Sequence, residues 1–200
     1  MRRLLPVVRQ HRRPLMIGVF AGLIALILQV AVPAAVRAAV DIADAPSVGR
    51  FPKGSVADPV EAVRTSGTVD VLAEPDDGDV DLLLVGIGSM ATTALAAAEK
   101  LAAEGVRVRV VDPVWALPVS DDLVALARSA GRVAVVEDNV VVGGIGSQVE
   151  LALRGAGLAT PLDQLGIPKE FLDHGSRGQV LDRVGLTPDA VAGRLRARLG

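Results

Sequence analysis

The sequence contains no cysteine and no tyrosine, and its 200 residues include only one tryptophan and three phenylalanines. Without cysteine the chain can form no disulfide, no thiolate nucleophile and no cysteine-ligated metal site. Imidazole could come only from His11 and His174. Because aromatic residues are few while 50% of the residues are hydrophobic, the core must be built from Val, Leu, Ile and Ala. Such a composition is typical of a parallel sheet covered by alanine-rich helices.

Acidic residues are absent from the first 40 positions, which hold six arginines. The net charge of −2 for the whole chain therefore leaves −8 on residues 41–200. An acidic domain that has neither a basic face nor an aromatic stacking platform is a poor nucleic-acid binder. We therefore exclude nucleic acid as a partner.

Charge is also absent from residues 15–36. As a helix this segment would extend about 33 Å, enough to cross a hydrocarbon core of about 30 Å. We predict one transmembrane helix with its N-terminus inside, because most flanking arginines precede it. A cleaved signal peptide is the alternative, since residues 31–39 are rich in small side chains, although Arg37 disfavours cleavage. The chain as it stands is thus predicted to be a single-pass membrane protein.

The N-terminal 44 residues contain Arg3-Leu4-Leu5-Pro6, His11-Arg12-Arg13-Pro14, the apolar run through Pro33, and Val40-Asp41-Ile42-Ala43-Asp44. This string resembles the first transmembrane helix of ABC-type exporters, and it carries no catalytic signature.

Apolar runs and helical patterns alternate from Val80 onward, which predicts βα units and a small, mostly parallel sheet. Residues 45–79 are rich in Pro, Gly, Asp and Ser and are predicted to be a linker with one short hairpin around Gly67. Residues 80–200 form the predicted α/β domain. We expect strands at 81–85, 106–111 and 133–137, an extended piece at 162–165, and helices at 89–104, 121–130, 147–154, 178–184 and 187–199.

Two glycine-rich turns could hold an anion. Gly86-x-Gly88-x-x-Ala91 follows a strand, and Asp112 ends the next one, which together match the pattern of a dinucleotide site. The alternative is that these small residues only let strand and helix pack closely. Gly143-Gly144-x-Gly146-Ser147 offers backbone N–H groups, but the acids Glu137 and Asp138 that precede it favour a structural or interface loop.

Two groups of polar residues could suggest catalysis. Asp173-His174-Gly175-Ser176 contains the ingredients of a triad, yet neighbours in a turn rarely point at one another, so we favour a capped turn that leads into a helix. Glu137 and Asp138 are adjacent on a strand and therefore face opposite sides, which disfavours a catalytic carboxylate pair.

Six elements occur in one order: Arg50-Phe51-Pro52-Lys53-Gly54, Leu83 to Ser89, Val111-Asp112-Pro113, Val136-Glu137-Asp138, Gly143 to Ser147, and Asp173 to Ser176. Together they resemble the C-terminal part of the 1-deoxy-D-xylulose-5-phosphate synthase family, from about Gly49 to Gly200. The resemblance implies a transketolase C-terminal-like α/β three-layer sandwich that supports a dimer. It also implies a cytoplasmic, thiamine-diphosphate- and Mg²⁺-dependent transferase that condenses pyruvate with glyceraldehyde 3-phosphate for isoprenoid and thiamine biosynthesis.

Arg50 matches the first arginine of the family's Arg-aromatic-Pro-basic-Gly element, so the resemblance implies that it binds the phosphate of the aldehyde substrate. The family's cofactor and metal sites lie in two upstream domains that have no counterpart in this sequence. The resemblance therefore implies a chain that is inactive alone and binds neither cofactor nor metal by itself, with the missing synthase domains or a second copy as partner.

The resemblance to an exporter ends at Asp44, and the resemblance to the synthase family begins at about Gly49. We interpret this change as a junction between unrelated pieces, with the family function residing after Asp44. If the pieces belong together, the alternative is a membrane-tethered binding module without catalysis. A nucleotide binder built on the Gly86 turn is the third hypothesis.

Overall fold

The computed structural model describes residues 60–76 and 79–199. The predicted transmembrane segment at 15–36 and the Arg50 element lie outside these residues. Contact clustering divides the chain into Met1–Phe51 and Pro52–Gly200, and the fold below concerns the second unit. Across the described ranges, no helix is both long and apolar enough to cross a membrane.

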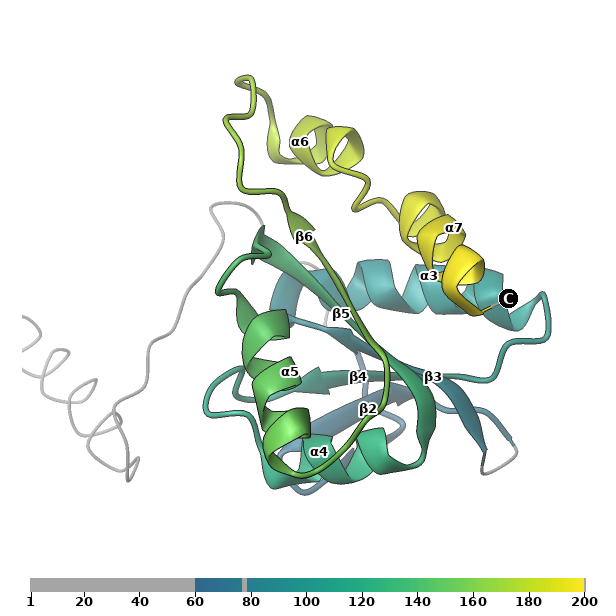
Figure 1. Cartoon of the computed structure of the whole chain (residues 1–200). Coiled ribbons are helices and arrows are strands. Elements are labelled where there is room, and N and C mark those ends of the chain that lie inside the picture. Colours follow the sequence, from purple (N-terminus) through teal and green to yellow (C-terminus); the bar gives the residue numbers. More distant parts are fainter. Residues whose placement is uncertain (1–59, 77–78, 200) are drawn as a thin grey trace, which may run out of the picture. The chain divides into compact units, whose positions relative to one another are not determined.

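A six-stranded mixed sheet forms the centre of this unit, in the order β1-β2-β4-β3-β5-β6 (Figure 1). The β3–β4, β3–β5 and β5–β6 pairs are parallel, whereas the β1–β2 and β2–β4 pairs are antiparallel. The strands are β1 (Arg64–Ser66), β2 (Val69–Ala73), β3 (Val80–Gly86), β4 (Val108–Pro113), β5 (Ala130–Val140) and β6 (Leu162–Ile167).

Helices cover both faces of the sheet, which gives the predicted three layers (Figure 1). One apolar cluster joins the sheet to α3, α6 and α7, and a second joins it to α4 and α5. The helices are α3 (Ala91–Ala102), preceded by the 3₁₀ turn η1 (Gly88–Met90), α4 (Asp121–Arg128), α5 (Ile145–Gly155), α6 (Arg177–Arg183) and α7 (Pro188–Leu199).

The two hydrophobic clusters confirm the prediction that aliphatic residues and alanine, not aromatic residues, build the core. Helix α3 turns a stripe of small residues, Ala91, Ala94, Ala97 and Ala98, toward the sheet and buries them with Leu101. Spacing of three and four residues places these side chains on one helical face. A methyl group added at Gly86 would lie 2.8 Å from the Cα atom of Ala91, so the Gly86 turn allows strand and helix to pack closely.

Side-chain caps and a glycine mark several helix ends. Ser120 caps α4 by accepting from the N–H of Leu123, and Ser176 forms a capping box with Gln179 at the start of α6. Gly105 has φ +88° after α3, where glycine is the favoured residue. Ser176 thus ends the Asp173–Ser176 segment as a helix cap, and the structure assigns no turn to these four residues.

The sheet is wider than expected. The hairpin around Gly67 (φ +58°) exists, but it extends the main sheet, because β2 pairs with β4 and β1 pairs with β2. The sequence placed residues 64–73 in a linker. Short strands at a sheet edge have weak sequence signals because tertiary pairing decides them.

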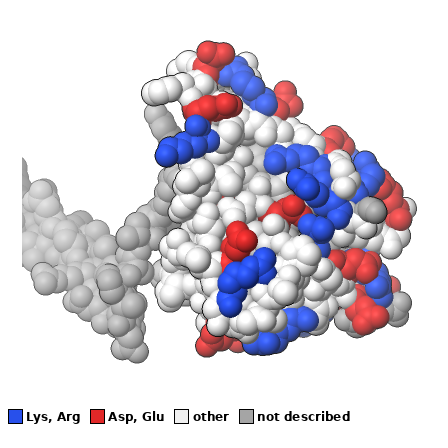
Figure 2. All heavy atoms as spheres, viewed as in Figure 1, with Lys and Arg blue, Asp and Glu red and all other residues white. Residues whose placement is uncertain are grey.

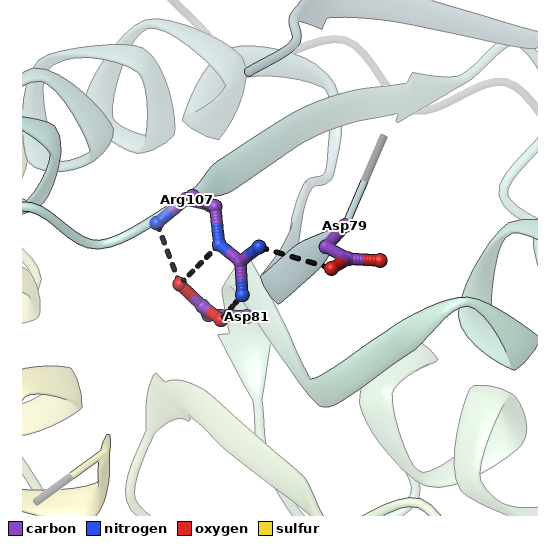
Figure 3. Close-up of polar contacts among 3 residues, drawn as sticks. All are labelled: Asp79, Asp81 and Arg107. Carbon is purple, nitrogen blue, oxygen red and sulfur yellow. Dashed lines mark hydrogen bonds and ion pairs between the residues drawn. The ribbon is translucent and has the colours of Figure 1, made fainter. Parts of the chain in front are cut away.

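Arg107 ties the amino ends of β3 and β4 together (Figure 3). Its guanidinium donates to Asp81 at 2.6 and 3.1 Å and to Asp79 at 3.2 Å, and its backbone N–H also donates to Asp81. The hydrogen bonds from Arg107 lower the pKa of the Asp81 carboxyl below its usual value. These contacts lie at the edge opposite the loops considered next.

Candidate functional site at the carboxyl edge of the sheet

Loops at the carboxyl ends of β3, β4, β5 and β6 leave the sheet at one edge, because these strands are parallel. Strand β3 leads to α3 on one face, while its neighbours β4 and β5 lead to α4 and α5 on the other. In α/β sheets such a reversal opens a crevice in which ligands bind. The glycine turns, Asp112, Glu137 and Asp138 lie at this edge, and Ser176 caps the helix α6, whose Arg177 contacts Asp138.

Gly88 has φ +54°, and its N–H donates to the Asp112 carboxylate at 3.3 Å. Burial raises the pKa of Asp112 to about 6, the Gly88 hydrogen bond opposes this rise, and the charge of Asp70 adds to it. Asp70 lies directly opposite Asp112 in the β2–β4 register. A carboxylate thus stands against the turn where a dinucleotide phosphate would bind, which disfavours the nucleotide hypothesis.

The backbone N–H groups of the second glycine turn also bind a side chain of the protein itself. The N–H groups of Ile145 and Gly146 donate to the carboxylate of Glu137 at 2.8 and 2.9 Å. The Glu137 side chain is buried, with 1% of its residue surface exposed, and the positive end of α5 stabilises its charge. This cap starts α5 at Ile145, two residues before the predicted start. The loop is therefore structural, as the sequence favoured.

Glu137 and Asp138 bind different partners. Asp138 accepts from Arg177 Nε at 2.7 Å, and the same guanidinium donates to Ser89 Oγ at 3.0 Å. Arg177 therefore bridges the ends of β3 and β5 and holds the start of α6 at this edge of the sheet. The sequence motifs did not identify Arg177 as a candidate functional residue. Only its position directly after the Asp173–Ser176 segment could have suggested it.

Asp173 and His174 are exposed, and Ser176 is engaged in its cap. The edge therefore brings carboxylates and one arginine together without a nucleophile and base in contact. In the described ranges, no group of three or more His, Asp or Glu could hold a metal ion.

Residues 72–191 match the protein family described as transketolase, C-terminal domain. The chain belongs to this family. The chain is also 49% identical over 165 residues to 1-deoxy-D-xylulose-5-phosphate synthase 2 of Kitasatospora griseola, a match that covers 80% of this chain and 26% of that protein. A synthase of Clavibacter sepedonicus is 51% identical over 155 residues, which is 77% of this chain and 24% of the relative.

Among solved structures, "Split gene transketolase, inactive beta4 tetramer" matches this transketolase C-terminal domain with a TM-score of 0.58 and 29% identity. The match covers 68% of this chain and 43% of that one. The chain spans about a quarter of the length of the curated relatives it matches.

These findings correct the localisation predicted from the sequence. The part that matches a family is a transketolase C-terminal domain, and a relative of this chain is a 1-deoxy-D-xylulose-5-phosphate synthase. The prediction of a single-pass membrane protein is wrong because it rested only on an apolar run and its flanking charges. The exporter likeness of residues 1–44 gains no support from these relatives, and those residues lie outside the described ones.

Proposed function

We propose that residues from about 49 to 200 are the C-terminal portion of a thiamine-diphosphate-dependent 1-deoxy-D-xylulose-5-phosphate synthase. The observation that carries this proposal is identity of 49% and 51% to two such synthases over about a quarter of the length of each. The reaction would join pyruvate and glyceraldehyde 3-phosphate with loss of CO₂.

The described residues do not fit the cofactor. A bound diphosphate and Mg²⁺ need backbone donors and a set of oxygen ligands. The two turns that offer donors are directed at Glu137 and Asp112, and no cluster of acids or histidines within the described part suits a metal. We therefore assign the cofactor to the upstream domains and derive no chemical step from this domain.

The contribution we propose for this chain is to complete the synthase as a folded partner and to supply Arg50. An arginine can bind a phosphate through two parallel hydrogen bonds, which suits the phosphate of glyceraldehyde 3-phosphate. In the completed enzyme, Arg50→Ala should raise the KM for this aldehyde by about 10- to 100-fold, the loss expected for hydrogen bonds to a charged group. The KM for pyruvate should stay within about 2-fold. Arg194→Ala is the control, and equal changes for both substrates would reject this role.

A further part of the proposal is that the chain is inactive alone. The experiment supplies purified chain with pyruvate, glyceraldehyde 3-phosphate, thiamine diphosphate and Mg²⁺, with and without the upstream three-quarters of the Kitasatospora griseola synthase. We expect product only when both pieces are present. Product from the chain alone would refute the inactivity, and no product from the pair would reject the proposed function.

A further inference from the structure

Exposed apolar side chains gather at the carboxyl edge of the sheet. Eight large hydrophobic residues of the described part are exposed, and six of them lie at the end of β5 or on the loops after β4, β5 and β6. These six form what we name the edge patch: Val114, Trp115, Leu117, Val140, Val142 and Phe171. The other two are Val63, beside β1, and Leu151 on α5.

Parallel pairing brings these loops to one side of the molecule. Strands β4, β3, β5 and β6 are neighbours in that order, so the loops that follow β4 and β6 flank those that follow β3 and β5. In the view of Figure 1 this edge faces left and upward, and Figure 2, seen from the same side, shows charged side chains near α6. Apolar groups that gather in this way mark interaction surfaces.

The loop that carries Trp115 is fixed by the β1–β2 hairpin. The N–H of Val114 donates to the carbonyl of Thr68 at 3.1 Å. Thr68 in turn donates through its N–H and its hydroxyl to Asp122, both at 3.0 Å. Both ends of the loop are therefore held to one turn.

The loop that carries Val142 is fixed as well. The N–H of Val141 donates to the carbonyl of Ile167 at 2.9 Å, and Ser147 Oγ donates to the carbonyl of Val141 at 3.0 Å. Glu137 holds the following turn through two backbone N–H groups. Loops that are ordered before binding lose less conformational entropy when a partner docks.

We propose that the edge patch is the docking surface for the upstream domains of the synthase, an inference that rests on the proposed function. The matched relatives carry about three-quarters of their length outside the segment shared with this chain, and this large portion must meet the domain somewhere. Both faces of the sheet are already covered by helices. The carboxyl edge is where the described domain leaves large apolar groups uncovered.

The chain offers a matched control for this surface. Val142 in the edge patch and Leu151 on α5 have 66% and 65% of their surface exposed, so Val142→Asp and Leu151→Asp place the same charge on equally exposed positions. Binding of the full chain to the upstream three-quarters of the Kitasatospora griseola synthase is measured by titration calorimetry. We expect Val142→Asp to raise the Kd by about 10-fold or more, the effect of losing an interface hot spot, and Leu151→Asp to leave it within about 2-fold.

Unfolding midpoints of both variants in urea show whether each is folded. If Val142→Asp is unstable, Val142→Ser provides a milder change at the same position, for which a smaller rise in Kd is expected. Equal affinity of all folded variants, or equal loss with Leu151→Asp, would overturn the proposal.

Trp115 gives a second readout, because it is the only tryptophan of the chain. Chain labelled with 5-fluorotryptophan has one ¹⁹F resonance, and about half of the Trp115 surface is exposed (52%). We expect this resonance to shift and to lose its solvent-isotope effect when the upstream piece binds. An unchanged resonance in a formed complex would place the contact elsewhere and overturn the proposal.

These outcomes separate the two proposals. If the wild-type pair makes product while edge-patch variants bind and react normally, the docking surface is wrong and the function stands. If the pair neither binds nor reacts, both are rejected. If the chain instead self-associates through the edge patch, so that Val142→Asp changes its mass in ultracentrifugation, a second copy is the occupant and the assignment to upstream domains falls.

Discussion

The buried carboxylate of Glu137 accepts the backbone N–H of Gly146 at 2.9 Å and thereby caps a helix from the strand that precedes it. Its second oxygen accepts the N–H of Ile145 at 2.8 Å. The glycines around this contact are a steric requirement, because a Cβ atom at Gly144 would lie 2.5 Å from the carboxylate. The glycine turn before α5 could bind an anion, and the carboxylate of Glu137 from the same chain occupies it.

Replacement of Glu137 by Gln should destabilise the domain. The amide nitrogen would face one of the two N–H donors and leave it unsatisfied, which costs about 1–3 kcal/mol. Urea unfolding measures the difference. Glu99→Gln, at an exposed position of α3, is the control and should stay within about 0.5 kcal/mol; an equal loss in both variants would contradict the capping role.

Asp112 should make stability fall as the pH rises from about 4 to 6. Burial raises its pKa to about 6 in the folded state, so the folded protein holds a proton that the unfolded chain, with a pKa of about 3.9, has already lost. This contribution is fully present below about pH 4 and disappears above about pH 6, a loss of about 1–3 kcal/mol.

The variant Asp112→Asn should remove this dependence, because an amide oxygen can still accept from Gly88 and carries no charge opposite Asp70. We expect it to be more stable than the wild type at pH 7.5, by urea unfolding, and to show a flatter profile between pH 4 and 6. Asp182→Asn, on the exposed side of α6, should keep the wild-type profile. A stability of Asp112→Asn below that of the wild type at pH 7.5 would be the contrary result.

Arg177 should govern the local opening of α6. Its ion pair with Asp138 is partly exposed, with 44% and 26% of the two side chains accessible, and pairs of this kind contribute about 0.5–1 kcal/mol. Arg177→Ala should therefore speed amide hydrogen exchange across α6 by about 2- to 5-fold. Arg194→Ala on α7 should leave these rates unchanged, and unchanged rates in Arg177→Ala would show that the core contact of Leu181 alone holds the helix.

Gly86→Ala should destabilise the fold by about 1–3 kcal/mol, because the new methyl group overpacks the contact with Ala91 and Ala94. Gly193→Ala offers the opposite expectation. Gly193 lies within α7 with no atom within 4 Å of an added Cβ, so alanine should stabilise the helix by about 0.5–1 kcal/mol. Thermal unfolding of both variants tests the pair, and a neutral Gly86→Ala would mean that α3 can move away.

The order of six short elements was sufficient to predict the family, and the match of residues 72–191 confirms it. Local chemistry also predicted the capped start of α6 and the closing helix, which the structure places at Pro188–Leu199. These features depend on contacts within a few residues, so they can be predicted from the sequence without knowledge of the fold. The membrane localisation failed because hydropathy and flanking charge describe one segment and not the protein to which it is attached.

Other features depend on which segments meet in space, and only the tertiary structure decided them. The hairpin of β1 and β2 joins the sheet because β4 offers it a free edge, and Arg177 reaches Ser89 because β3 and β5 are neighbours. The glycine turns offered an anion site in the sequence, but Glu137 and Asp112 occupy their N–H groups from separate strands. The sequence thus determined the family and the local elements, whereas long-range pairing determined which polar groups are satisfied internally and which apolar groups remain exposed at the carboxyl edge.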